Sequence, residues 1–169
     1  MSKSLELIYQ PIPPDESSEA LGSAVGRVIA ESGAIAIASP YLSIEVLLPL
    51  VEGRTFRLVT DQYACFESGG NERLFGFFRE HLSCIRSVRG LHAKVVLGEQ
   101  AALFGSANLT MNGLCHRFEV AGVVRGDHLE ELRKWFESSL FLRTGATVEG
   151  GSVASGGPNE FVLGGGGTA

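Results

Sequence analysis

The sequence predicts an α/β fold in which helices sandwich a mixed, largely parallel β-sheet. Short apolar runs of strand length alternate with segments whose apolar residues recur at helical spacing, which is typical of this class. The chain has 169 residues, of which 44% are hydrophobic and 20% charged, enough for one globular domain with a sizeable core. From residue 144 onward Gly, Ser, Ala and Thr dominate. We therefore predict one domain over residues 1–143 and a flexible tail over 144–169, which could be a linker to an additional domain or partner.

The amino-terminal half is expected to alternate strands and helices. An extended segment over 8–14 ends in prolines, and a helix follows that Asp15 or Ser17 can cap and that ends near Glu31. A strand, a short helix, a strand, a loop and another helix are predicted at 34–38, 44–51, 55–60, 61–70 and 71–82. The helix at 71–82 has an apolar stripe that we interpret as core packing rather than as a platform for nucleic-acid bases: Leu74, Phe75, Phe77 and Phe78.

The carboxyl-terminal half predicts further strands and a last helix. The strands are expected at 85–88, 92–97, 101–104 and 119–124, with a loop at 110–116 and a helix at about 127–140. Gly98 supplies a turn, so the strands on either side of it are expected to pair. A sheet of this kind places functional groups at strand ends, where we expect His92 and Asn108.

A histidine and a lysine stand two residues apart, at His92 and Lys94, in an apolar run. Alternate side chains of a strand share a face, so the imidazole and the ammonium should be neighbours. The next strand ends in Gly105 and Ser106, just before Asn108. An imidazole that can attack phosphorus, an ammonium and an amide together predict a phosphoryl-transfer site. Taken alone, His-x-Lys is more often a solvated strand edge, and Gly-Ser-Ala-Asn is a common loop composition.

His92-x-Lys94 followed by Gly105-Ser106-x-Asn108 resembles the HKD signature of the phospholipase D superfamily. That superfamily includes lipid phosphodiesterases, phosphatidyl transferases, endonucleases and a DNA-repair phosphodiesterase. The resemblance implies a phospholipase D-like domain in which His92 is the nucleophile and forms a phosphohistidine intermediate. It further implies that Lys94 and Asn108 hold the phosphate, and that neither a metal nor another cofactor takes part.

Two carboxylates extend the comparison with that superfamily. Glu119 opens an apolar strand and resembles the glutamate that hydrogen-bonds and orients the catalytic histidine. The superfamily's aspartate, five residues after the lysine, is replaced here by Glu99, and the gap from Glu99 to Gly105 is one residue shorter than usual. Because that aspartate is largely structural, the resemblance implies a supporting role for Glu99, behind the groups that contact the substrate.

The overall charge does not by itself indicate a nucleic-acid binder, since the formal net charge is −5 and the sequence pI about 5.4. Local positive charge nevertheless surrounds the predicted site, at Arg86, Arg89 and Arg117. Such arginines can bind phosphate oxygens in a basic groove, or they can form a solvated face, and the sequence leaves both interpretations open. We take Arg89, Arg117 and Ser106 as candidate substrate-binding residues.

The cysteines and histidines argue against other kinds of site. Cys65, Cys84 and Cys115 are widely spaced and odd in number, which favours neither a disulfide framework nor a zinc site. The other histidines share no metal-ligand spacing. No apolar run reaches the roughly 18 residues that a membrane span needs, and the first ten residues lack the layout of a signal peptide. We expect a cytoplasmic protein with reduced thiols.

The resemblance also implies a homodimer, because the superfamily's site needs two HKD motifs and this chain has one. The function that we favour is metal-independent cleavage of DNA or RNA phosphodiester bonds by a nuclease. One alternative is a lipid or small-molecule phosphodiesterase, although no amphipathic helix with outward aromatics is evident. Another is a non-catalytic binding or dimerisation module of the same fold, for which the replacement at Glu99 is the best support.

Overall fold

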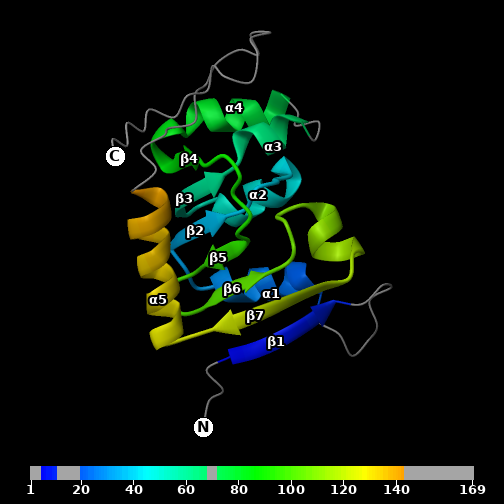
Figure 1. Ribbon diagram of the computed structural model, residues 1–169, viewed down its shortest axis with the longest axis vertical. Coiled ribbons are helices and arrows are strands. Elements are labelled where there is room, and N and C mark those ends of the chain that lie inside the picture. Colours follow the sequence, from blue (N-terminus) through cyan, green and yellow to red (C-terminus); the bar gives the residue numbers. More distant parts are fainter. Residues whose placement is uncertain (1–4, 11–19, 68–71, 143–169) are drawn as a thin grey trace, which may run out of the picture.

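The computed structural model describes residues 5–10, 20–67 and 72–142. They form a seven-stranded mixed sheet in the order β1-β7-β6-β5-β2-β3-β4, with helices on both faces (Figure 1). The strands are β1 (Leu5–Gln10), β2 (Ala34–Ala38), β3 (Thr55–Thr60), β4 (Ile85–Ser87), β5 (Val95–Leu97), β6 (Ala102–Gly105) and β7 (Glu119–Val124). The helices are α1 (Leu21–Ile29), α2 (Ile44–Val51), α3 (Gln62–Glu67), α4 (Glu72–Glu80) and α5 (Asp127–Trp135), with short helical turns η1 (Leu82–Cys84), η2 (Asn112–His116) and η3 (Phe136–Phe141).

The predicted α/β class is confirmed, and β2, α2, β3 and β7 have the predicted bounds. The first strand differs, because β1 begins at Leu5 rather than at residue 8 and pairs with β7 along its whole length. The predicted caps of the first helix, Asp15 and Ser17, lie outside the described residues. So does the predicted tail over residues 144–169.

Two segments predicted as loops contain helical structure, and in both a side chain caps the first turn. In the segment 61–70, Oδ1 of Asp61 accepts the N–H of Ala64 at 3.2 Å, and α3 follows. In the segment 110–116, Oγ1 of Thr110 accepts the N–H of Gly113 at 3.1 Å, and η2 follows. Such caps satisfy backbone donors that a helix end leaves without a partner, so short helices form where apolar periodicity is weak.

The sheet is mixed, as predicted, but its antiparallel part is larger than predicted. Among the described strands, the β2–β3 and β3–β4 pairs are parallel. The pairs β1–β7, β7–β6, β6–β5 and β5–β2 are antiparallel. For the β5–β6 pair the reason is the short connection, in which Gly98 donates to the carbonyl oxygen of Ala101 at 2.9 Å, because parallel strands need a long crossover.

The sheet separates two apolar cores. On one face α1, α2 and α4 pack on the strands, and the predicted apolar stripe of α4 lies in this core, with Leu74, Phe77 and Phe78 buried and Phe75 partly buried. On the other face α5 and η3 pack on the strands through Leu129 and Phe136. Within the described ranges, no helix combines the length and the apolar character needed to cross a membrane.

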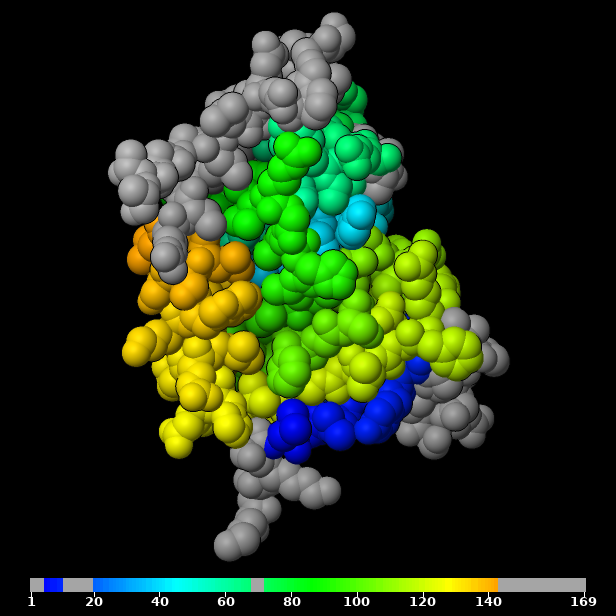
Figure 2. Space-filling model, viewed as in Figure 1, coloured from blue at the N-terminus to red at the C-terminus, as the bar shows by residue number. Residues whose placement is uncertain are grey.

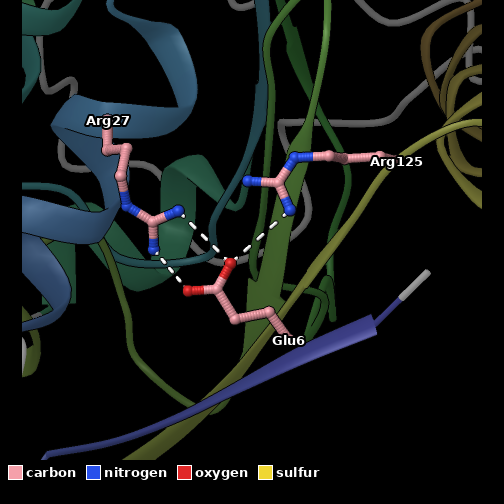
Figure 3. A network of polar contacts seen from close by, with 3 residues as sticks. All are labelled: Glu6, Arg27 and Arg125. Atoms are coloured by element: carbon pink, nitrogen blue, oxygen red, sulfur yellow. Dashed lines mark hydrogen bonds and ion pairs between the residues drawn. The ribbon is translucent and has the colours of Figure 1, made fainter. Parts of the chain in front are cut away.

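Glu6 of β1 binds arginines from two other segments (Figure 3). Its Oε1 accepts from Nη2 of Arg27 at 2.7 Å, and its Oε2 accepts from Nη1 of Arg27 at 3.3 Å and from Nη1 of Arg125 at 3.5 Å. Arg27 belongs to α1 and Arg125 follows β7, so the carboxylate ties the edge strand to both neighbours. The hydrogen bond from Arg27, together with the charges of both arginines, lowers the pKa of Glu6.

Replacing Glu6 with glutamine should lower the free energy of unfolding at neutral pH by less than about 1 kcal/mol, because these ion pairs are exposed to solvent. A carboxylate with a lowered pKa stabilises the fold above the pKa of the unfolded chain, and this stabilisation is lost as the pH falls through the folded value. The difference between wild type and Glu6→Gln in urea unfolding should therefore shrink as the pH falls from the unfolded pKa, about 4.3, and disappear below the lowered pKa of the folded state. Glu52→Gln is the control, since the Glu52 carboxylate has no ion pair with the described residues. A difference that persisted at low pH would contradict the electrostatic origin.

Candidate active site

One edge of the sheet gathers the strand ends that carry the predicted site residues. At this edge β5 begins, β6 ends and β7 begins, because each of these strands runs antiparallel to the next. His92 and Lys94 precede β5, Ser106 and Asn108 follow β6, and Glu119 opens β7. The structure therefore brings these predicted residues to the same edge, together with the carboxyl end of β2.

His92 and Lys94 lie just before β5, which begins at Val95, and not inside a strand as predicted. On one side β5 pairs with β2, and this pairing stops at Val95 because its partner, Ala38, is the last residue of β2. On the other side the N–H of Gly105 donates to the carbonyl oxygen of Lys94 at 3.2 Å, which keeps Lys94 in line with β6. The His92 side chain is exposed and makes no hydrogen bond with the described residues, so its imidazole can meet a ligand from solvent.

Lys94 is a buried cation at this edge. Only 9% of its surface is exposed, and its Nζ donates to the carbonyl oxygen of His92 at 2.7 Å. Burial lowers the pKa of Lys94, and the negative charge of Glu119 opposes this shift. Because burial disfavours the charged form, an ammonium held here costs stability. A phosphate beside it would offset part of this cost, so the position is suited to an anionic ligand.

Glu119 and Ser106 form a hydrogen-bonded pair between β7 and β6. The Ser106 hydroxyl donates to Oε2 of Glu119 and accepts the N–H of Val120 at 3.2 Å. The predicted hydrogen bond from His92 to Glu119 is not among the contacts of the described residues. The Glu119 carboxylate instead accepts from Ser106 and attracts Lys94.

The turn that carries Asn108 is held to the carboxyl end of β2. The N–H of Leu109 donates to Oγ of Ser39 at 3.0 Å, and the N–H of Ser43 donates to the carbonyl oxygen of Leu109 at 3.0 Å. Oδ1 of Asn108 is buried and has no hydrogen-bond partner among the described residues. A buried acceptor without a partner is unusual and costs stability, which favours a role for Asn108 beyond folding.

Three buried polar residues that the sequence analysis did not single out position this edge: Gln10, Ser39 and Asp61. Ser39 holds the Asn108 turn, as described above. Oδ2 of Asp61 accepts the N–H of Gly90 at 2.8 Å, which fixes the segment leading to His92. Each of the three lies at the end of a strand or just after it. In a sequence whose strand order is unknown, a polar residue at such a position is only a weak indication of a functional site.

Gln10 anchors the segment between Asn108 and Glu119. Its Nε2 donates to the carbonyl oxygens of Gly113 at 3.1 Å and of Arg117 at 2.9 Å. Its Oε1 accepts the N–H of Leu21 at 2.9 Å, at the start of α1. One buried amide thus joins β1, α1 and η2, so the position of η2 depends on the edge strand.

Glu99 lies at the opposite edge of the sheet, beyond the carboxyl end of β5. Its Oε1 accepts the N–H groups of Gly33 and Ala34, each at 3.1 Å, and its own N–H donates to Oγ of Ser32 at 2.9 Å. These bonds tie the β5–β6 turn to the start of β2. Glu99 therefore supports the sheet and does not contact the residues gathered at the other edge.

The arginines predicted near the site have different surroundings. Arg86 donates to three backbone carbonyls and lies 4.5 Å from the ring centroid of Phe141, so it belongs to the packing around η3. Arg89 lies in the β4–β5 connection, 4.9 Å from the ring centroid of Tyr63, and Arg117 is exposed just before β7. In the strand order β4 and β7 lie on opposite sides of β5, three and two strands away, so Arg89 and Arg117 remain candidates for contacts with an extended anionic ligand.

This edge combines an exposed imidazole, a buried ammonium, an amide and a carboxylate. Such groups can attack phosphorus, neutralise charge on its oxygens and handle a proton. The described residues contain no group of three His, Cys, Asp or Glu side chains placed to hold a metal ion. The side chains that are present at this edge suit nucleophilic attack combined with charge neutralisation.

No family model and no curated protein matches this sequence. Its structure is similar to NucT from Helicobacter pylori, with a TM-score of 0.64 and 15% identity over 85% of this chain and 97% of NucT. It is similar to Nuc from Salmonella typhimurium, a phospholipase D family member, with a TM-score of 0.62 and 15% identity over 86% of this chain and 98% of Nuc. Phosphatidylserine synthase from Haemophilus influenzae Rd KW20 also matches, with a TM-score of 0.65 and 10% identity over 94% of this chain but 41% of the synthase. The chain therefore has the phospholipase D-like fold that the resemblance implies.

Replacing Gly113 with alanine should destabilise the protein by about 1–3 kcal/mol and displace the Asn108 turn. A Cβ atom at Gly113 would lie 2.4 Å from the carbonyl oxygen of Asn108, which is backbone and cannot swing away. Gly26→Ala is the matched control, because Gly26 is a helical glycine with nothing within 4 Å of a Cβ. The control should gain about 0.5–1 kcal/mol. Urea unfolding of both variants tests this, and a Gly113→Ala protein as stable as wild type would contradict the packing.

Proposed function

We propose that this chain, with its phospholipase D-like fold, is a metal-independent phosphodiesterase that cleaves DNA or RNA. The observation that carries the proposal is the gathering of His92, Lys94, Asn108 and Glu119 at one edge of the sheet. These residues come from three separate segments, and the HKD resemblance assigns a role to each. The simpler interpretation of His-x-Lys is a solvated strand edge. That interpretation does not explain why Lys94 is buried or why Oδ1 of Asn108 has no hydrogen-bond partner among the described residues.

In the proposed first step, a ring nitrogen of His92 attacks the phosphorus of a phosphodiester. A nitrogen–phosphorus bond forms, the bond to the leaving oxygen breaks, and His92 of the partner subunit protonates that oxygen. In the second step water attacks the phosphohistidine and gives its proton to the same imidazole of the partner subunit. The nitrogen–phosphorus bond breaks and both histidines return to their first state. One chain supplies one such histidine, so this mechanism requires a homodimer.

Lys94 and Asn108 are proposed to hold the phosphate during both steps. The attack increases negative charge on the non-bridging oxygens, and a cation in a poorly hydrated position stabilises that charge better than one in water. Lys94 is such a cation, because little of its surface is exposed. The amide of Asn108 supplies hydrogen bonding beside it. Glu119 is proposed to orient His92 once the substrate is bound, with Ser106 holding the carboxylate in place.

Nucleic acid is the substrate that we favour. The likeness to Nuc and NucT extends over nearly the whole of those chains, whereas the likeness to phosphatidylserine synthase covers less than half of that enzyme. Arg89, which follows β4, and Arg117, which precedes β7, lie on opposite sides of β5 in the strand order. A polymer of phosphates would have charge on both sides of the cleaved bond. The synthase likeness supports a lipid phosphodiesterase as the second candidate function, and substrate comparison separates the two.

His92→Ala should lower phosphodiester hydrolysis by about 10³-fold or more, because it removes the nucleophile and, in the partner, the proton donor. We would measure hydrolysis of bis(p-nitrophenyl) phosphate, of single- and double-stranded DNA, of RNA and of phosphatidylcholine vesicles, all in EDTA. His128→Ala is the matched control, since His128 is exposed on α5 beside Glu131, and it should keep wild-type rates. Equal turnover by wild type and His92→Ala would refute the mechanism, and preferred cleavage of the vesicles would refute the nucleic-acid substrate.

Lys94→Met should abolish most activity without lowering stability. The folded state holds Lys94 with a lowered pKa, so the charged form is disfavoured on folding, and an uncharged side chain of similar length removes that cost. Between the pKa of Lys94 in the folded state and its higher pKa in the unfolded chain, the free energy of unfolding of the wild type should increase as the pH rises. The Lys94→Met protein should not show this increase. Thermal unfolding and turnover measured together check this, with an expected loss of about 10²–10³-fold in kcat. Joint loss of stability and activity would show that Lys94 is retained for folding.

A further inference from the structure

The place of the His92 imidazole depends on the backbone that carries it. The side chain is exposed and makes no hydrogen bond with the described residues, and strand β5 begins only at Val95. Neither a side-chain partner nor a strand therefore fixes the ring. A reacting group must be placed closely, because a displacement of about 1 Å can cost roughly 10²-fold in rate. Other contacts must then hold the chain on both sides of His92.

On the carboxyl-terminal side the backbone is held by Lys94. Its carbonyl oxygen accepts the N–H of Gly105 at 3.2 Å, which joins it to β6. Its Nζ donates to the carbonyl oxygen of His92 at 2.7 Å. The peptide that follows His92 is thus fixed from the β5 side.

On the amino-terminal side a turn of four residues, Val88–Leu91, leads to His92. The N–H of Leu91 donates to the carbonyl oxygen of Val88 at 3.1 Å and closes the turn. Gly90, its third residue, has φ +76°, in the left-handed region that glycine adopts without strain. Figure 2 shows the connection from β4 to β5, which contains this turn, at the surface of the molecule (bright green). Surface connections are usually the mobile part of a fold, so a turn beside a nucleophile needs support.

Asp61 supplies a hydrogen bond to the middle of this turn. Its Oδ2 accepts the N–H of Gly90 at 2.8 Å, and only 7% of the residue is exposed. A hydrogen bond from a backbone N–H to a carboxylate is stronger than one between neutral groups. The other oxygen, Oδ1, accepts the N–H of Ala64 at 3.2 Å at the start of α3. One buried carboxylate at the end of β3 therefore joins α3 to the turn that precedes His92.

The start of α3 meets the same segment at two further points. The N–H of Gln62 donates to Oγ of Ser87 at 3.2 Å. The guanidinium carbon of Arg89 lies 4.9 Å from the ring centroid of Tyr63. The first residues of α3 thus form a support for the segment that leads to His92, and Asp61 is the member of this support that is nearest to His92 along the hydrogen-bonded path.

We propose that Asp61 is a positioning residue for His92, which acts by holding the Val88–Leu91 turn and with it the nucleophilic imidazole. This inference rests on the proposed function, in which His92 attacks phosphorus. A helix cap needs one acceptor oxygen, whereas Asp61 uses its second oxygen on the turn. Asparagine has one side-chain acceptor oxygen and would direct an NH₂ donor at one of the two N–H groups. Asp61→Asn therefore cannot keep both hydrogen bonds.

The first test is the kinetics of bis(p-nitrophenyl) phosphate hydrolysis in EDTA. Asp61→Asn should lower kcat by about 10- to 10²-fold, because the ring of His92 is displaced. KM should stay within about threefold of the wild-type value, because Lys94 and Asn108, which are proposed to hold the phosphate, belong to other contacts. Asp127→Asn is the matched control, since it also removes a carboxylate from the first turn of a helix, and it should change neither constant.

A second pair of variants separates positioning from stability. Gly90 and Gly53 have φ +76° and +71°, and neither has an atom within 4 Å of the place that a Cβ would take. Alanine should therefore strain the backbone to a similar degree at both positions, and the urea midpoint should fall by similar amounts. Only Gly90→Ala should also lower kcat, because Gly53 lies in the connection between α2 and β3.

The imidazole signal of His92 in ¹H–¹³C NMR spectra, assigned with His92→Ala, reports on the ring without turnover. It should be shifted or broadened in Asp61→Asn and Gly90→Ala and unchanged in Gly53→Ala. Wild-type kcat in both Asp61→Asn and Gly90→Ala would overturn the inference, and so would an equal loss of kcat in Gly53→Ala. A wild-type protein that hydrolyses no phosphodiester would refute the proposed function. The His92 signal would still decide the inference in that case, since an unchanged signal in Asp61→Asn overturns it and a changed signal supports it.

Discussion

The antiparallel pairing of β5, β6 and β7 is the constraint on which the candidate site depends. Because each strand reverses direction, the start of β5, the end of β6 and the start of β7 meet at one edge. Two backbone hydrogen bonds continue this pairing to the edge, from Gly105 to Lys94 at 3.2 Å and from Ser106 to Val120 at 3.1 Å. A shift of one residue in either pair would turn Lys94 and Glu119 to the other face of the sheet, so register and site are inseparable.

Several polar groups at this edge are placed at a cost to stability. Lys94 is buried with its charge disfavoured, and Oδ1 of Asn108 is buried without a partner among the described residues. The surrounding structure offsets this through satisfied buried groups, since Ser39 and Gln10 each join two or more segments by hydrogen bonds. Rigid support around strained or desolvated functional groups is what a preorganised site requires, because groups that must not move during a reaction need fixed neighbours.

The sequence predicts those features that depend on local pattern. The bounds of β2, α2, β3 and β7 follow from apolar runs bordered by polar or turn residues, and His92, Lys94 and Asn108 follow from a short motif. The start of β5 could not be predicted, because it depends on where β2 ends in space, at Ala38. The same holds for Gln10, whose partners Gly113 and Arg117 are more than a hundred residues away. The helix α3 was missed for a different reason, since its signal is the capping residue Asp61 rather than apolar periodicity.

The sheet face on which α5 packs carries apolar side chains both under the helix and beyond it. Under α5, buried Val95 and Val124 stabilise the monomer. On β1, Leu7 and Tyr9 are exposed, so they bury little apolar surface within the chain. Exposed apolar residues on an edge strand favour aggregation. Gly122 lies between the two halves, and because it has no side chain it leaves room for Phe104 of β6 and Leu5 of β1.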